Sequence, residues 1–97
     1  MTDQLALAIL DGEWRPQRLL TLRQDWHGLL YHLLRDQGSW VALIQRRGIH
    51  MSPLPCWHDV ALTRTIARSL RPLEMMLADH VIHAGETRFS FREAGLL

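Results

Sequence analysis

Six histidines and one cysteine are the residues of this sequence best suited to metal or acid–base chemistry. Cys56 and His58 form a C-x-H pair, and His80 and His83 form an H-x-x-H pair. Together the four offer the nitrogen and sulfur ligands that zinc prefers, but their spacing matches no familiar zinc-finger pattern. We therefore expect ordinary buried or half-exposed histidines, and we predict no metal site and no cofactor.

Motifs typical of enzymes are not found in this sequence. Cys56 stands beside His58 and Asp59, which are the residue types of a nucleophile site. A working cysteine, however, needs a base that a third group aligns in space, and neighbours in sequence rarely satisfy this. There is no glycine-rich phosphate loop, carboxylate pair or nucleophile elbow. We predict a non-catalytic protein with no small-molecule substrate.

Arginine supplies all of the basic residues, and three arginines recur at helical spacing. Arg64, Arg68 and Arg71 stand at i, i+4 and i+7, with no acidic residue between Asp59 and Glu74. Three arginines on one helical face can hold three phosphates of a nucleic acid. A solvated helix face, or pairing with carboxylates of the chain or of a partner, accounts for the same pattern. The sequence leaves both interpretations open.

Length and composition bound the protein class. At 97 residues and 47% hydrophobic content the chain has the size of a single domain, which we place at 1–97. The net charge of +1 excludes a generally polycationic protein. One cysteine permits no internal disulfide and favours a cytoplasmic location. No apolar run approaches the roughly 18 residues of a membrane span, and the N-terminus lacks a basic signal-peptide region.

The main apolar stripe predicts helix in the first half of the chain. The residues of this stripe are spaced alternately by three and four positions, as on one face of a helix: Leu19, Leu22, Trp26, Leu29 and Leu33. A helix over 3–11 precedes it. The segment 16–36 is either one helix or two, and a break near Asp25 is favoured slightly because Asp25 can act as an N-cap and Gly28 weakens a helix interior.

The second half has one ambiguous segment and a clearer end. Residues 39–51 read either as a hairpin or as a short helix. After the prolines at 53 and 55, a helix is predicted over 57–70. Pro72 then starts a further helical turn, whose face would carry Leu73, Met76, Leu77 and His80. The alternation after Gly85 predicts a terminal β-hairpin.

The order of elements resembles the winged-helix variant of the helix-turn-helix family. It consists of a helix at 3–11, Trp14, a helix at 16–23, a tight turn, a helix at 25–37 and a hairpin with the tip sequence RRG, over about 3–52. The resemblance implies an α+β, helix-dominated fold, with a winged-helix-like core of three helices and a small hairpin at 3–52. Helical and hairpin elements follow at 57–97, and a small all-α bundle is the alternative.

The same resemblance implies a role in DNA recognition. The third helix would enter the major groove and the wing would touch the backbone, which puts Trp26, His27, Tyr31 and Arg35 near the recognition helix and Arg46 and Arg47 on the wing. The predicted function is a DNA-binding transcriptional regulator that contacts phosphates through arginines. Its predicted nucleic-acid contacts are Arg35, Arg46, Arg47, Arg64, Arg68 and Arg71.

Apolar surface supports a second hypothesis. Tryptophan is enriched at binding hot spots, so Trp14, Trp26 and Trp57 are candidate interface residues. Several leucines fall outside the main stripes, and a helix that is apolar nearly all round is either central or covered by another subunit. We therefore expect a homodimer. The alternative function is a protein–protein interaction module, such as an adaptor, inhibitor or small subunit, with no nucleic-acid contact.

Overall fold

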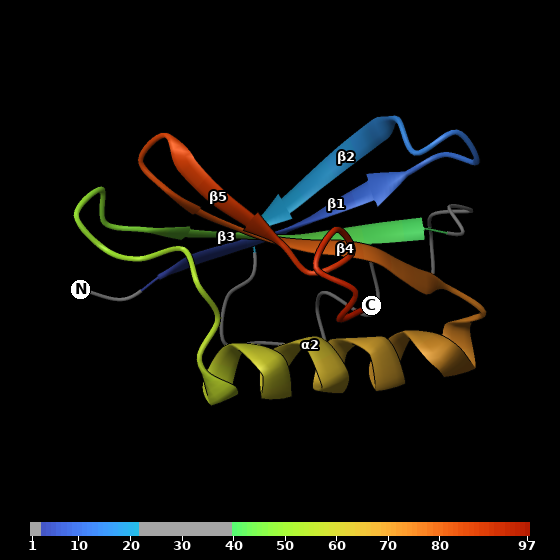
Figure 1. The fold of residues 1–97 in the computed structure, drawn as a ribbon. Helices are drawn as coiled ribbons and strands as arrows, with labels where there is room; N and C mark the ends of the chain where they lie inside the picture. Colours follow the sequence, from blue (N-terminus) through green and yellow to red (C-terminus); the bar gives the residue numbers. More distant parts are fainter. Residues whose placement is uncertain (1–2, 22–39) are drawn as a thin grey trace.

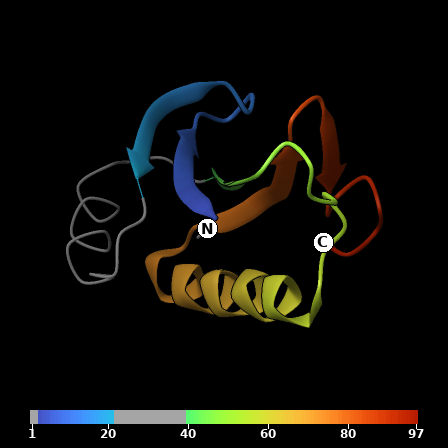
Figure 2. The ribbon, with the colours of Figure 1, turned by 90° about the vertical axis from the view of Figure 1, so that its left-hand side faces the viewer.

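The computed structural model describes residues 3–21 and 40–97, which form one five-stranded sheet and a helix. The strands are β1 (Gln4–Leu10), β2 (Pro16–Thr21), β3 (Trp40–Arg47), β4 (Met76–Ala84) and β5 (Thr87–Ser90). The helix α2 (Trp57–Leu70) is followed by a 3-10 turn, η1 (Arg71–Leu73). Figures 1 and 2 show α2 lying along one face of the sheet.

The sheet takes strands from both sides of the proline-containing connector, in the order β2-β1-β3-β4-β5. β1 runs antiparallel to both β2 and β3, whereas β3 and β4 are parallel. Parallel neighbours need a crossover, and α2 supplies it. β5 returns antiparallel to β4 through a two-residue turn at Gly85, whose φ is +63°.

The core lies between α2 and the sheet. Strand residues of one parity, Leu7 and Ile9 in β1 and Val41 and Leu43 in β3, pack with helix residues that include Ile66. All five are nearly inaccessible to solvent. α2 is therefore an amphipathic helix held by its apolar face. It is too short and too polar to cross a membrane, and the described residues contain no helix that could.

The opposite face of the sheet carries a smaller apolar group. Ala8, Leu10 and Ala78 are buried there, with Trp40, Ala42 and Ile44 packed against them. β1 is thus buried on both faces, since its neighbouring residues Leu7 to Leu10 are all closed to solvent.

The prediction of a helix-dominated winged-helix fold is wrong, as is the all-α alternative. Within the described residues α2 is the only α-helix, and segments predicted as helices at 3–11 and 16–23 form β1 and β2 instead. A short apolar run such as 5–10 fits a strand buried on both faces as well as it fits a buried helix, so periodicity alone does not separate them. The predicted helix at 25–37 lies outside the described residues.

The second half of the chain was predicted better. The helix at 57–70 and the terminal hairpin are confirmed. Residues 40–47 form a strand, but β3 pairs with β1 and β4 rather than with a return strand at 49–51, so the predicted wing is wrong. The predicted helical turns after Pro72 are also wrong beyond η1. Residues 76–84 form the strand β4 instead, in which every second residue, His80, Ile82 and Ala84, is buried.

Candidate functional site

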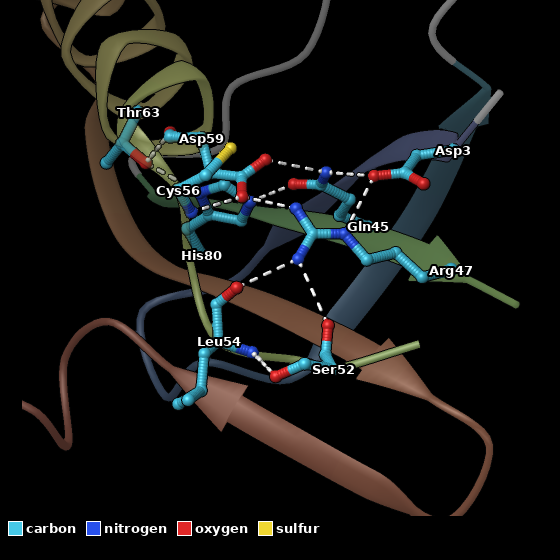
Figure 3. A network of polar contacts seen from close by, with 9 residues as sticks. All are labelled: Asp3, Gln45, Arg47, Ser52, Leu54, Cys56, Asp59, Thr63 and His80. Atoms are coloured by element: carbon cyan, nitrogen blue, oxygen red, sulfur yellow. Dashed lines mark hydrogen bonds and ion pairs between the residues drawn. The ribbon is translucent and has the colours of Figure 1, made fainter. Parts of the chain in front are cut away.

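A cluster of polar side chains lies where β3 ends and α2 begins, on the sheet face that α2 covers (Figure 3). Four segments contribute to it. β3 presents two side chains of the same parity, α2 presents two that are one turn apart, and β4 and the residue before β1 present one each. We call these residues the polar cluster: Asp3, Gln45, Arg47, Asp59, Thr63 and His80.

Arg47 is the cation of the polar cluster. Its Nε donates to Asp3 Oδ2 at 2.9 Å, and its Nη2 donates to Asp59 Oδ2. Its Nη1 donates to the backbone carbonyls of Ser52 at 3.2 Å and Leu54 at 2.9 Å. The Arg47 side chain is only 10% exposed. A single guanidinium therefore joins the N-terminal segment, the loop at 48–56 and α2, which is a use of the rigid arginine fork that a lysine ammonium does not match.

Asp59 is the central acceptor of the cluster. Its Oδ2 accepts from Arg47 and, at 2.8 Å, from the backbone N–H of Cys56, while its Oδ1 accepts from Gln45 Nε2 at 3.0 Å. Burial opposes ionisation of this carboxyl, but the hydrogen bonds from Arg47, Cys56 and Gln45 outweigh it and lower the pKa of Asp59 to about 2. Asp59 is therefore a carboxylate at neutral pH.

Gln45 fixes the tautomer of His80. Because Gln45 Nε2 donates to carboxylates of Asp3 and Asp59, its Oε1 is the atom that faces His80, and it accepts from His80 Nε2 at 2.8 Å. In the neutral ring His80 Nδ1 is then left as an acceptor that faces the Thr63 hydroxyl at 2.6 Å. The same hydroxyl lies 2.9 Å from the backbone carbonyl of Asp59, and its single proton can serve only one of these two acceptors at a time. Phe91 stacks on the imidazole at a centroid distance of 4.3 Å.

His80 is held in the neutral state. Its side chain is fully closed to solvent, and burial lowers its pKa to about 4, although the negative charges of Asp59 and Asp79 act in the other direction. The same ion pairs act on Arg47. Burial opposes its charge, but the hydrogen bonds that it donates to Asp59 and Asp3 outweigh burial and raise the pKa of Arg47.

The polar cluster is internally satisfied. No buried side-chain nitrogen or oxygen of the described residues lacks a hydrogen-bond partner. Both nitrogens of His80 are engaged, and both oxygens of Asp59 accept hydrogen bonds. A general base must reach the proton that it abstracts, and neither group has a free position for this. The arrangement is better suited to holding chain segments together through hydrogen bonds and ion pairs than to proton transfer.

The predicted arginine contacts are separated by the fold. Arg46 and Arg47 lie in β3 and not on a wing. Arg46 is exposed and Arg47 is enclosed by the polar cluster. Arg64 and Arg68 are exposed on α2 and Arg71 follows in η1, so these three do share one side of the molecule. Arg35 lies outside the described residues.

The predicted interface tryptophans also differ in their surroundings. Trp57 begins α2 with 71% of its surface exposed, stacked on His58. Trp14, 41% exposed, packs on Trp40 at a centroid distance of 5.2 Å and lies under the guanidinium of Arg92. Trp26 lies outside the described residues. Of the described pair, Trp57 has the freer surface.

The residues of the C-x-H and H-x-x-H pairs do not come together into one site. His80 enters the polar cluster, whereas His58 stacks on Trp57 and Cys56 is exposed at the start of α2. Across residues 3–21 and 40–97 no three side chains among His, Cys, Asp and Glu come together in a manner that could hold a metal ion.

Sequence reasoning missed Asp3 and Gln45, and it considered Asp59 only as a neighbour of Cys56. Two signals were available. In β3 the polar Gln45 and Arg47 continue the inward parity of Val41 and Leu43. Asp59 also stands three residues after the N-cap of α2, which is the acidic position of a capping box.

Comparison with known proteins adds a family relationship. A family model described as RadC-like JAB domain matches residues 39–96, which is more than half of the chain. A comparison with curated proteins finds no match. The matched residues include β3, α2, β4 and β5, and hence most of the polar cluster. The match and the five-stranded sheet contradict the predicted winged-helix, helix-turn-helix transcriptional regulator.

Proposed function

We propose that this chain, which belongs to the RadC-like JAB domain family, is a metal-independent binding domain rather than a hydrolase. The family is associated with DNA repair and its members are often catalytic, as JAMM-type metalloproteases. A metal-dependent protease activates water on a metal that three protein ligands hold. The proposal therefore depends on whether the polar cluster of this chain suits a metal ion.

The residues of the cluster do not fit a divalent cation. The two carboxylates, Asp3 and Asp59, already share the guanidinium of Arg47. A metal ion bound between them would stand next to a fixed positive charge, and it would have to displace that charge from a site with little solvent to stabilise it. His80 offers no free nitrogen, because Thr63 and Gln45 occupy both. The position of Arg47 between Asp3 and Asp59 is the observation that carries the proposal.

The cluster instead fixes the loop that leads into α2. Arg47 holds the carbonyls of Ser52 and Leu54, and Asp59 holds the backbone N–H of Cys56. These three contacts hold the loop in one conformation. Less conformational entropy is then lost when a partner binds to this part of the surface. A cytoplasmic location, expected from the single cysteine, belongs to the same proposal.

Metal content and hydrolysis test the proposal together. The purified chain would be dialysed against zinc and then against buffer, and its metal measured by plasma mass spectrometry. Cleavage of quenched-fluorescent peptides would be followed with and without zinc. We expect that the chain retains no zinc bound through Asp59 and that it does not cleave the peptides. One retained zinc per chain that is lost in Asp59→Asn, or cleavage that a chelator stops, would overturn the proposal.

A further inference from the structure

The solvent face of α2, together with the first residue of η1, carries a straight row of side chains that the polar cluster does not use. Its residues are spaced by four, three, four and three positions, and all five are exposed. This spacing is that of the contact positions in a two-helix seam. We call the row the arginine seam: Trp57, Ala61, Arg64, Arg68 and Arg71.

The seam lies on the side of the helix opposite to its buried residues. Thr63, Ile66 and Leu70 face the core, which leaves the seam fully clear of the sheet. Its length from Trp57 to Arg71 is about 21 Å at the rise of an α-helix. It is an unpartnered helix face with a bulky aromatic at one end and three cations along the rest.

The cations of the seam have no ion-pair partner within the part of the chain that the structure describes. No ion pair joins Arg64, Arg68 or Arg71 to any described residue, although Arg15, Arg47 and Arg88 all have carboxylate partners. The acidic residue that α2 does contain, Asp59, is turned inward and held by Arg47. The outer surface of the helix is therefore positively charged without compensation from its own side chains.

We propose that the arginine seam docks an acidic α-helix of a partner protein, with carboxylates at spacings of three and four opposite the arginines and an apolar residue opposite Trp57. On a helix, carboxylates at spacings of four and then three residues lie about 6 Å and 10.5 Å along the axis from the first one, which matches the positions of the three arginines. Trp57 supplies the aromatic anchor typical of an interface hot spot. Its stacking on His58, at a centroid distance of 3.7 Å, orients the ring in advance.

Residues 3–21 and 40–97 of a second copy of the chain do not offer the complementary surface. Among the described acidic residues only Glu74 and Glu86 have a side chain without a hydrogen bond or ion pair, and they lie after η1 and in the β4–β5 turn, at different places in the fold. They make no row that could match the seam. The partner is therefore expected to be a different protein.

Nucleic acid fits the surface less well. The net charge of +1 provides little long-range attraction for a phosphate backbone. The loop that precedes the seam exposes aliphatic Ile49, Met51 and Leu54, whose side chains are each more than 60% accessible. Aliphatic side chains do not provide the stacking platforms that unpaired bases use. Exposed apolar side chains are instead usual where one protein contacts another.

Designed peptides test the charge match directly. The probe is a fluorescein-labelled, alanine-rich helical peptide of about 18 residues with glutamates at spacings of three and four and one terminal leucine, long enough to form a helix. A second peptide carries glutamine in place of every glutamate. Fluorescence anisotropy should show binding of the glutamate peptide, weaker at higher salt, and at least about tenfold weaker binding of the glutamine peptide.

Variants of the chain locate the site. Arg64→Glu and Arg68→Glu together should lower the affinity for the glutamate peptide by at least about tenfold, and Trp57→Ala by several-fold. Arg46→Glu is the matched control, because Arg46 is exposed on β3 with the opposite parity to the residues that face α2. A peptide with lysine in place of glutamate should bind the double variant, which also shows that the variant is folded.

The proposal is overturned by absence of binding to the glutamate peptide, by an equal loss in Arg46→Glu, or by tighter binding of labelled single-stranded or duplex oligonucleotides. It rests on the proposed function only in treating the chain as a binding domain. No seam residue belongs to the polar cluster, so zinc-dependent hydrolysis would remove the proposed function without affecting peptide binding. Failure of the peptide would leave the metal-independent polar cluster intact.

Discussion

Arg47 Nη2 donates to Asp59 Oδ2 across the junction between β3 and α2, and the two side chains are only 10% and 6% exposed. The pair joins residues 12 positions apart in the sequence. It brings a charge from a central strand against the first turn of the crossover helix, where a carboxylate is also favoured by the helix dipole. Asp3 and Gln45 each bind one member of this ion pair, and His80 is connected to it through Gln45.

Loss of the Arg47 charge should destabilise the fold. Arg47→Leu leaves the Asp3 and Asp59 carboxylates without their cation, and breaking a buried pair in this way costs about 3 to 5 kcal/mol. Arg47→Lys should recover only part of this, because one ammonium cannot reach four acceptors. Urea unfolding measures the difference, with the exposed Arg46→Leu as control. A free energy of unfolding for Arg47→Leu within about 0.5 kcal/mol of wild type would contradict the assignment.

Asp59 should govern stability at strongly acidic pH. Its folded pKa, about 2, lies below the ordinary value of 3.8, so its contribution is complete above pH 3.8 and is lost as the pH falls toward 2. Asp59→Asn should be less stable at neutral pH and should show a flatter decline between pH 4 and 2. Denaturant midpoints over this range give the comparison. A decline as steep as that of the wild type would show that other carboxyls are responsible.

His80 should make the protein less stable in mild acid. Its folded pKa, about 4, is below the ordinary 6.5, so between these values the unfolded chain binds a proton that the folded chain does not. Stability is therefore complete above pH 6.5 and decreases as the pH falls to 4, by a few kcal/mol on the scale of about 1.4 kcal/mol per pKa unit. His80→Gln should flatten this part of the stability profile.

The control for His80 is His50→Gln, which removes an exposed histidine from the loop after β3. It should keep the wild-type dependence on pH. If His50→Gln and His80→Gln change the profile between pH 6.5 and 4 equally, the buried imidazole is not its source.

Some elements were predictable from local patterns, and others depended on partners far away in the sequence. The helix at 57–70 has a proline-rich boundary and one apolar face, and the hairpin around Gly85 has strict alternation, so both were found. β1 and β2 have no such signal. A strand between two others is apolar on both faces, and only the sheet that surrounds Leu7 to Leu10 distinguishes it from a buried helix.

The polar cluster could not be predicted from the sequence for a related reason. Arg46 and Arg47 are adjacent, and their sequence invites a common role, yet strand geometry sends them to opposite faces of the sheet. Only the inward one meets Asp59. Once 40–47 is known to be a strand, the parity of Val41, Leu43 and Arg47 predicts an arginine in the core, which in turn requires a carboxylate nearby.

The β4–β5 turn should need glycine at position 85. Gly85 has a φ of +63°, and a Cβ there would meet the Cβ of Ile49 at 3.4 Å. An L-residue in the left-handed region costs about 1 to 2 kcal/mol, so Gly85→Ala should lower the melting temperature by several degrees. Differential scanning calorimetry measures the shift. Gly12→Ala, where nothing lies within 4 Å, is the matched control and should change the melting temperature little.

Replacing the arginine and the glutamine of β3 by histidines should turn the polar cluster into a metal site. Positions 45 and 47 both face Asp59, since Gln45 and Arg47 each donate to its carboxylate. Gln45→His with Arg47→His would remove the guanidinium and place two imidazoles beside one carboxylate, which is a ligand set that binds zinc with one position left open. The double variant should acquire stoichiometric zinc and gain thermal stability on adding it. Each single variant should not, because Arg47→His alone supplies only one imidazole and Gln45→His alone keeps the guanidinium. Equal zinc binding by the wild type and the double variant would show that Arg47 does not exclude the metal.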